Sequence, residues 1–259
     1  MMRKKLLSKE ILKQSIKNNR GLWLSLTGIL SFFITMMTLM ASKTLENQTP
    51  TSGGGFSGGG VSLMSLYANG VFGMLGIMIL LIFAIVVGNK LIASEIDKGT
   101  MCYTLNTPIT RLQIVLSKAL YYILSIVLMG VVVGLFGTVS ILIAGADVAF
   151  GTFWLLVLGF VLYGLAVGGI CFFASCFFNK SGNSLALGAG LSVAFFVLNS
   201  LSAISGLEWL EYFTLNTLYD TSAIISGSGF IVQMIALVVI GSILYVLGCN
   251  KFLKKDLPL

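Results

Sequence analysis

Histidine is absent from this sequence, and charged residues occupy only 10% of its 259 positions. Without histidine, the chain lacks the usual general base of a hydrolase, the commonest zinc ligand and the residue on which most proton relays depend. It also contains no Gly-x-x-x-x-Gly-Lys-Ser/Thr motif for cradling the phosphates of a nucleotide. These absences argue against an enzyme or a metal site, and any energy that drives this chain has to come from a partner.

Hydrophobic residues are abundant, at 57% of the chain, so a soluble fold would lack the polar side chains to cover its surface. A helix that crosses the roughly 30 Å hydrocarbon core of a bilayer needs about 20 apolar residues. We place six such spans near residues 21–41, 70–90, 119–145, 151–178, 182–206 and 229–249. The sequence therefore predicts an all-α integral membrane protein, with a six-helix transmembrane domain over residues 21–259 and a glycine-rich outer loop at 53–60.

The distribution of Lys and Arg predicts the orientation, because basic residues near the ends of spans are retained in the cytoplasm. Six spans place every basic residue except Lys43 on one side, together with both termini. An odd number of spans would break this pattern. We therefore expect cytoplasmic N and C termini and assign the net charge of +7 to the anionic bilayer surface rather than to a nucleic acid.

The first 20 residues are too polar to span. On a helix, Lys9, Lys13 and Lys17 share one side with Arg20, while apolar residues such as Ile11 occupy the other. This pattern predicts a cytoplasmic amphipathic helix along the inner leaflet. A basic segment that only sets the topology accounts for it equally well.

Pairs of glycines four residues apart occur within the spans, at Gly130 and Gly134 and at Gly164 and Gly168. Small residues at this spacing allow helix backbones to approach each other closely in a membrane. The pairs favour packing within one chain over a seam between two copies.

The cytoplasmic loop between the second and third predicted spans is the most informative segment. Gly99, preceded by Lys98, is typical of a helix end, and Thr107 with Pro108 suits the start of the next helix. Two helices that continue beyond the membrane and meet in a short tip would form a rigid docking surface. A simple connecting loop is the alternative.

The full string of this loop resembles the signature of the ABC transporter type-2 permease family. The matching residues are Glu95, Ile96, Gly99, Thr100, Leu105, the stretch Thr107-Pro108-Ile109-Thr110-Arg111, and Lys118. Thr110 stands where the family usually has serine. The resemblance covers nearly the whole chain, with a basic N-terminal segment, a long first outer loop, six spans and a short basic tail.

The resemblance implies that two permeases, identical or related, pair with two cytosolic ABC ATPase subunits that bind ATP and Mg, and that this chain holds no cofactor. It further implies that the loop docks on the ATPase and that residues 1–20 form the connecting helix. The implied coupling residues are Glu95, Gly99, Thr100, Met101, Tyr103, Leu105, Pro108 and Arg111. We expect Glu95 and Arg111 to pair across the hairpin.

Two shorter segments are weaker candidates. Asn179 and Lys180 form either a second cytoplasmic contact with the ATPase or a tight turn. The segment before the last span carries acidic and aromatic residues that suit an outer gate or an interfacial anchor. These gate candidates are Glu208, Trp209, Glu211 and Tyr212.

The resulting functional hypothesis is the permease subunit of an ABC exporter in a bacterial cytoplasmic membrane. Its apolar spans favour apolar or peptide cargo over sugars or ions. The resemblance implies amphipathic or hydrophobic cargo such as a peptide, an antimicrobial or a drug-like molecule. Two alternatives stay open: an ion-coupled secondary carrier, which would need a polar intramembrane site, and a membrane scaffold or sensor that transports nothing.

Overall fold

The computed structural model describes residues 8–46, 63–105, 109–145, 148–202, 209–210, 214–227 and 229–255, and every regular element within them is helical. Six helical segments in these ranges are long and apolar enough to cross a membrane. They are Lys9–Met40, Met64–Asp97, Arg111–Ala144, Phe150–Phe177, Ser181–Ser202 and Phe230–Lys254. The predicted all-α fold with six spans is confirmed, and the chain is a multi-pass membrane protein.

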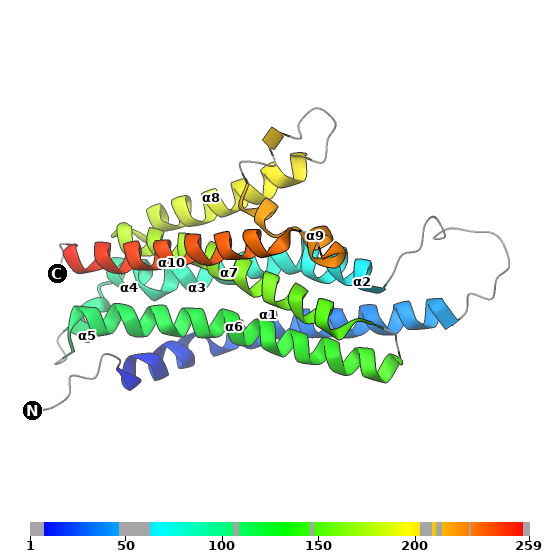
Figure 1. The fold of residues 1–259 in the computed structure, drawn as a ribbon. Coiled ribbons are helices and arrows are strands. Elements are labelled where there is room, and N and C mark those ends of the chain that lie inside the picture. Colours follow the sequence, from blue (N-terminus) through cyan, green and yellow to red (C-terminus); the bar gives the residue numbers. More distant parts are fainter. Residues whose placement is uncertain are drawn as a thin grey trace, which may run out of the picture.

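The spanning segments run side by side in one bundle (Figure 1). The long helices are α1 (Lys9–Glu46), α3 (Gly76–Leu91), α6 (Arg111–Ala144), α7 (Phe150–Phe177), α8 (Ser181–Ser202) and α10 (Phe230–Lys254). Shorter elements are α2 (Leu63–Leu66), the π-helix η1 (Tyr67–Leu75), α4 (Ala93–Asp97), α5 (Met101–Leu105), the 3-10 helix η3 (Leu215–Leu218) and α9 (Thr221–Ser226).

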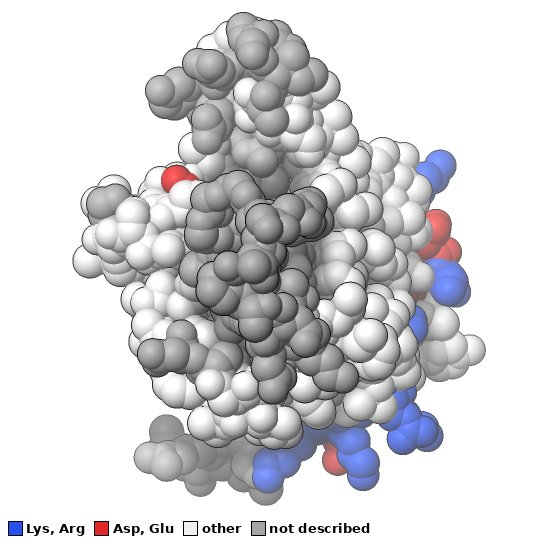
Figure 2. All heavy atoms as spheres, turned by 90° about the vertical axis from the view of Figure 1, so that its right-hand side faces the viewer, with Lys and Arg blue, Asp and Glu red and all other residues white. Residues whose placement is uncertain are grey.

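The start of α1 and the end of α10, together with α4 and α5, lie at the same end of the bundle (Figure 1). We call this the basic end, because its helix termini and turns carry most of the Lys and Arg residues. Those with described side chains at these termini and turns are Lys9, Lys13, Lys17, Arg20, Lys90, Lys98, Arg111, Lys118, Lys180, Lys251, Lys254 and Lys255. Figure 2 views the molecule from the opposite end, where the described surface is almost free of charged side chains.

Helix α7 forms the centre of the bundle and packs against α3, α6, α8 and α10. Its aromatic residues Phe153, Phe160, Tyr163 and Phe172 are fully buried. The glycine pairs serve this packing, as predicted: a Cβ atom on Gly130 would overlap Val161 Cγ2 of α7. The two backbones can lie this close only without a side chain at that position, so α6 and α7 approach closely within one chain.

Helix α1 differs from the expected arrangement of a separate connecting helix over residues 1–20, because it runs without a break from Lys9 to Glu46. Its 38 residues extend roughly 57 Å at 1.5 Å per residue, well beyond the hydrocarbon core. Buried Ile11, Ser15 and Asn19 continue the stripe by which α1 packs on the bundle. Trp23 Nε1 fixes this packing by donating a hydrogen bond to the carbonyl of Ser125 in α6 at 2.9 Å. Tertiary contact therefore keeps the first turns of α1 in line with the span.

The second span begins at residue 63, earlier than the predicted residue 70, and it is not a uniform α-helix. Its π-helical part contains Gly73, whose φ of −80° and ψ of −123° are not helical. The predicted outer loop at residues 53–60 lies outside the described residues. A segment that widens from α to π geometry changes which side chains face the neighbouring helices.

Helix α8 makes the loosest contact with the bundle. Among its described side chains only Ser184, Gly188 and Ser192 are buried, and none beyond residue 192 is. Figure 1 shows α8 diverging from its neighbours as it leaves the basic end.

Candidate functional site

The second spanning segment breaks at the basic end, at Ile92, whose φ of −129° and ψ of −63° separate α3 from α4. A break in a helix exposes backbone groups that need new partners. Helix α7 supplies one, because the buried hydroxyl of Ser175 accepts a hydrogen bond from the N–H of Ala93 at 2.8 Å. Helix α6 supplies another, because Lys118 Nζ donates to the carbonyl of Leu91 at 2.5 Å. Side chains of two other helices therefore satisfy the backbone groups on either side of the break.

Lys118 also forms an ion pair with Glu95 of α4. The Lys118 side chain is 3% exposed and that of Glu95 is 28% exposed, so the pair lies at the inner edge of the surface. Removing one partner of a buried pair leaves an uncompensated charge and is strongly destabilising. This contact fixes α4 to α6 at the point where the span ends.

Beyond α4 the chain turns sharply at Gly99, which has a φ of +70°. The left-handed conformation at a helix end favours glycine, so the predicted helix end at Gly99 is confirmed. The Thr100 hydroxyl donates a hydrogen bond to the carbonyl of Glu95 at 3.2 Å and closes the turn. The tip then forms α5, in which Met101 is buried and Tyr103 is 79% exposed.

The start of α6 differs from the prediction that Thr107 and Pro108 begin this helix. The N-cap is Thr110, whose hydroxyl accepts from the N–H of Gln113 at 3.4 Å while Gln113 Oε1 accepts from the N–H of Thr110 at 2.9 Å. This reciprocal capping box satisfies two donors of the first turn, which explains why the helix starts at Arg111. Pro108 and the Leu105 side chain lie outside the described residues.

Glu95 and Arg111 were expected to pair, and that expectation is wrong. The carboxylate of Glu95 is taken by Lys118. Arg111 Nη1 instead donates to the carbonyl of Lys255 at 3.2 Å, beyond the end of α10. Lys118 is buried in α6 and reaches Glu95 from inside the bundle. Arg111 lies on the exposed first turn of the same helix.

Lys255 joins three helix ends at this surface. Its Nζ atom donates to the carbonyls of Cys176 and Phe178, at 3.0 and 2.7 Å, where α7 ends. A lysine that caps the last carbonyls of a helix also complements the negative end of the helix dipole. Partial burial against α7 lowers the pKa of Lys255 to about 8. Because Arg111 binds the carbonyl of the same residue, the ends of α7 and α10 are tied to the start of α6.

The turn between α7 and α8 lies next to α4. Ser181, the first residue of α8, donates its N–H to Asp97 Oδ2 at 3.3 Å, and its hydroxyl accepts from Asn89 Nδ2 at 2.7 Å. A carboxylate at a helix N-terminus is favourable. The structure thus brings Asn179 and Lys180, both exposed, beside the α4–α5 hairpin.

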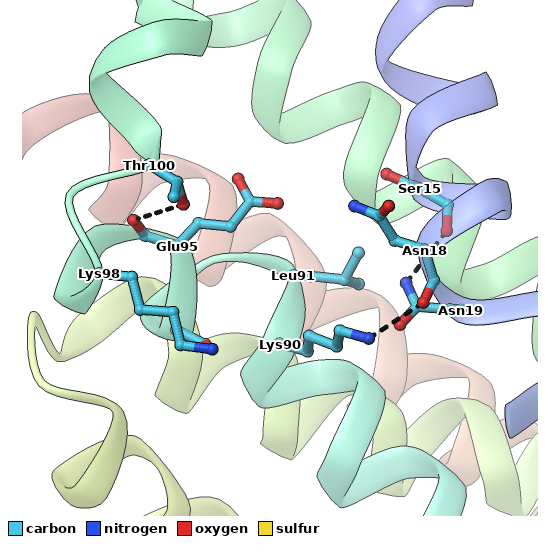
Figure 3. Close-up of a pocket in the computed structure, with 9 residues that line it drawn as sticks. Ser15, Asn18, Asn19, Lys90, Leu91, Glu95, Lys98 and Thr100 are labelled. Atoms are coloured by element: carbon cyan, nitrogen blue, oxygen red, sulfur yellow. Dashed lines mark hydrogen bonds between the residues drawn. The ribbon is translucent and has the colours of Figure 1, made fainter.

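A polar cavity of about 140 Å³ lies between α1 and the break in the second span. Its lining includes Asn18 and Asn19 of α1, Lys90 and Glu95. Figure 3 shows Lys90 reaching across to the carbonyl of Asn18, a hydrogen bond of 3.0 Å. Helix α1 therefore also contacts the segment that leads into the hairpin.

The outer gate candidates are mostly outside the described residues, since Glu208, Glu211 and Tyr212 are not among them. Trp209 is described and is 57% exposed. The structure leaves the predicted gate untested.

Several residues of the site were not singled out from the sequence as contacts, namely Asp97, Ser175, Ser181 and Lys255. No sequence pattern distinguishes a serine that bonds to a neighbouring helix from other serines in an apolar helix. Lys255 likewise cannot be distinguished in the sequence from the other basic residues of the tail. Lys118 was part of the family pattern, but its role was not assigned.

Among the described residues, no group of three His, Cys, Asp or Glu side chains is placed to hold a metal ion. The surface at the basic end has two exposed parts, the tip of the α4–α5 hairpin with Tyr103 and the turn at Asn179 and Lys180. An ion pair and hydrogen bonds join both parts to the spanning helices.

The profile of the family described as ABC-2 family transporter protein matches residues 5–257, nearly the whole chain. No curated protein matches the sequence. Members of this family are membrane components of transport that typically work with an ATPase subunit. With six membrane-crossing helices and a match over almost its full length, the chain belongs to the ABC-2 family of transporter proteins, as a transmembrane permease component.

Proposed function

We propose that this permease exports amphipathic or hydrophobic cargo, and that a cytosolic ABC ATPase drives it by docking on the α4–α5 hairpin. One observation carries the proposal: the hairpin presents the exposed Tyr103 at its tip while the Lys118–Glu95 ion pair anchors its base to α6. Exposed aromatic residues are frequent anchors of protein interfaces. A hairpin that is exposed at its tip and fixed to α6 at its base can transmit a displacement from the ATPase to the spanning helices.

The displacement passes along the ion pair and the hydrogen bonds that join the hairpin to the spanning helices. A displacement of α5 moves α4 through the closed turn at Gly99, and α4 acts on α6 through Glu95 and on α7 through the hydrogen bond at Ala93. The turn at Asn179 and Lys180 is a second contact for the ATPase, because Asp97 holds it beside α4. The start of α1 serves as the connecting segment, in line with the span rather than flat on the membrane.

The basic end faces the cytoplasm in this proposal, because positive charge near span ends is retained there. The membrane is then a bacterial cytoplasmic membrane, with both termini inside. Two permeases, identical or related, assemble with two ATPase subunits, and ATP and Mg bind to those subunits. The segment around Trp209 closes the outer side.

The cargo class rests on the composition of the spans. Many large apolar side chains along the bundle are exposed, such as Phe32 at 70% and Ile143 at 74%. Peptides, antimicrobials and drug-like molecules with apolar bodies suit such surroundings better than sugars or ions. A secondary carrier would continue to transport with ATP removed and would stop when the ion gradient collapses, which separates that class from this proposal.

Purification from native membranes under conditions that preserve complexes is the first test. We expect an ATP-binding subunit to co-purify with this chain, and cargo to stimulate its ATP hydrolysis in proteoliposomes. Glu95→Ala and Arg111→Ala variants are expected to insert normally and to lose that stimulation, with the exposed Glu10→Ala variant as the matched control. Isolation of the chain without any ATP-binding partner contradicts the proposal, and normal coupling in both variants removes these two residues from it.

A further inference from the structure

A second polar cavity, of about 270 Å³, lies at the end of the bundle opposite the basic end. It is bordered by η1, the last turns of α8, η3 and the start of α9, and it is partly open to the surface. Its polar lining consists of Asn69, Asn199, Ser200, Asn216, Tyr219 and Thr221. Met74, Ile77 and Phe196 add apolar walls, and no charged side chain is among the described residues that line it.

The side chain of Asn216 is the unusual feature of this cavity. The residue is 5% exposed, and its Oδ1 atom accepts a hydrogen bond from the hydroxyl of Tyr163 at 2.7 Å. Tyr163 stacks in turn on Tyr219, with 5.7 Å between the ring centroids. These contacts fix the amide, yet its Nδ2 atom has no hydrogen-bond partner in the part of the chain that the structure describes. Buried amide donors without a partner are rare in native proteins.

The opposite wall is built from the π-helix η1, and Gly73 with its non-helical backbone lines the cavity. π-helical turns occur frequently at functional sites because they displace side chains from regular helix packing. Helix α8 packs only loosely on the other side, since its described side chains beyond residue 192 are half-buried or exposed. A molecule in the apolar phase can therefore approach the cavity from between α8 and the bundle.

We propose that this cavity binds an uncharged carbonyl group, an ester or an amide, carried by an apolar molecule, and that Asn216 Nδ2 donates the hydrogen bond to it. The N–H donors of Asn216, which no described residue accepts, require an acceptor. The described residues that line the cavity carry no charge, which disfavours an ionised group there. Met74 and Phe196 contact the apolar body. The same chemistry occurs in the esters of membrane lipids and in the amides of an exported peptide.

As a cargo site this inference rests on the proposed function, but binding itself is measured on the permease alone. The probes are dioctanoylglycerol, its diether analogue without carbonyl groups, and the capped peptide acetyl-tetraleucine-amide. Each is titrated against the purified permease in detergent, and the bound fraction is read by native mass spectrometry. We expect the diester to bind about tenfold more tightly than the diether, as one hydrogen bond at a buried donor allows.

Matched variants locate the site. Asn216→Leu removes the amide and is expected to weaken binding about tenfold, whereas Tyr163→Phe removes the same internal hydrogen bond but keeps the N–H donors and is expected to bind within about threefold of wild type. Ser200→Phe fills the cavity from α8 and is expected to abolish binding. It keeps the test decisive if the Asn216 variant does not fold.

The binding results distinguish a lipid ester from a peptide amide as the source of the carbonyl group. Selective binding of the diester identifies the ester of a lipid, binding of the peptide that Asn216→Leu weakens identifies an exported amide, and either supports the inference. Equal affinity for diester and diether without peptide binding overturns it, as does equal loss in the Asn216 and Tyr163 variants or wild-type binding by Ser200→Phe. Such a failure leaves ATPase docking untouched, because no ATPase is present in the measurement.

Discussion

The ammonium group of Lys118 in α6 forms an ion pair with Glu95 where the second span breaks, and it also binds the carbonyl of Leu91 on the other side of that break. One side chain thus joins the end of a membrane-crossing helix to the hairpin that follows. This relationship makes the base of the hairpin part of the rigid bundle.

Replacing Glu95 with glutamine leaves the ammonium group of Lys118 without its counter-charge. We expect a loss of about 3 kcal/mol in stability and loss of cargo-stimulated ATP hydrolysis. A Glu95→Met, Lys118→Met double variant removes both charges and is expected to regain most of the stability but not the coupling. Thermal unfolding in detergent and ATPase assays in proteoliposomes measure the two effects.

Glu10→Gln provides the control, because Glu10 is exposed on α1. The same chemical change there is expected to leave both readouts unaltered. A Glu95→Gln variant with the melting temperature of wild type would show that the pair contributes nothing to the fold.

Lys255 predicts a pH dependence. Burial lowers the pKa of this lysine to about 8 from its ordinary 10.5, so between these values the unfolded chain binds more protons than the folded one. Stability contributed by this group therefore rises with pH from about 8 to 10.5. The Lys255→Met variant is expected to lack this rise, whereas the exposed Lys254→Met variant retains it. Melting temperatures across this range test the sign, and a fall with rising pH in the wild type alone would refute it.

Gly99 has a positive φ, and a side chain there strains the turn between α4 and α5. Gly99→Ala is expected to lower stability by about 1 kcal/mol and to weaken ATPase docking, because the tip shifts relative to its base. Gly182→Ala is the matched control, since Gly182 has open space around it in the first turn of α8. Thermal unfolding and co-purification of the ATPase measure the two effects. Equal behaviour of the two variants would speak against a role for the turn geometry.

Gly130 tests the packing of α6 against α7. An alanine there would place its Cβ on top of Val161 Cγ2, so we expect Gly130→Ala to cost about 1–3 kcal/mol. Adding Val161→Ala is expected to restore part of that loss, while Gly151→Ala, in open space, changes little. Thermal unfolding of wild type, these variants and Val161→Ala alone gives the comparison, and additive losses in the double variant would exclude this contact as the cause.

The sequence predicted the spans well because apolar length and the positions of basic residues follow directly from the bilayer. It also identified the turn at Gly99, since glycine directly after a lysine is typical of the left-handed residue that ends a helix. The predicted pairing of Glu95 with Arg111 was wrong because charge and proximity in sequence do not reveal which cation lies on the inner face of a helix. The capping box at Thr110 was readable from Gln113 three residues later, but Thr107 and Pro108 were favoured instead.

Other features depend on tertiary contact. Continuity of α1 through Gly21 follows from the packing of Ile11 and Asn19, which composition alone does not reveal. The π-helix at Tyr67–Leu75 and the isolated amide of Asn216 have no sequence pattern of their own. Both lie at the end of the bundle for which the sequence predicted an outer loop and either a gate or an interfacial anchor.

Photo-cross-linking at the hairpin tip tests the central claim most directly. A photoreactive phenylalanine analogue replaces Tyr103, which is 79% exposed. The same analogue at the exposed Phe150, the first residue of α7 and therefore beyond the far end of α6, serves as the control. After irradiation of native membranes, the account predicts that position 103 is joined to a protein with the nucleotide-binding motifs of an ABC ATPase and that position 150 is not. Cross-links from position 103 that never include such a protein, in cells that carry out the transport, would contradict the account.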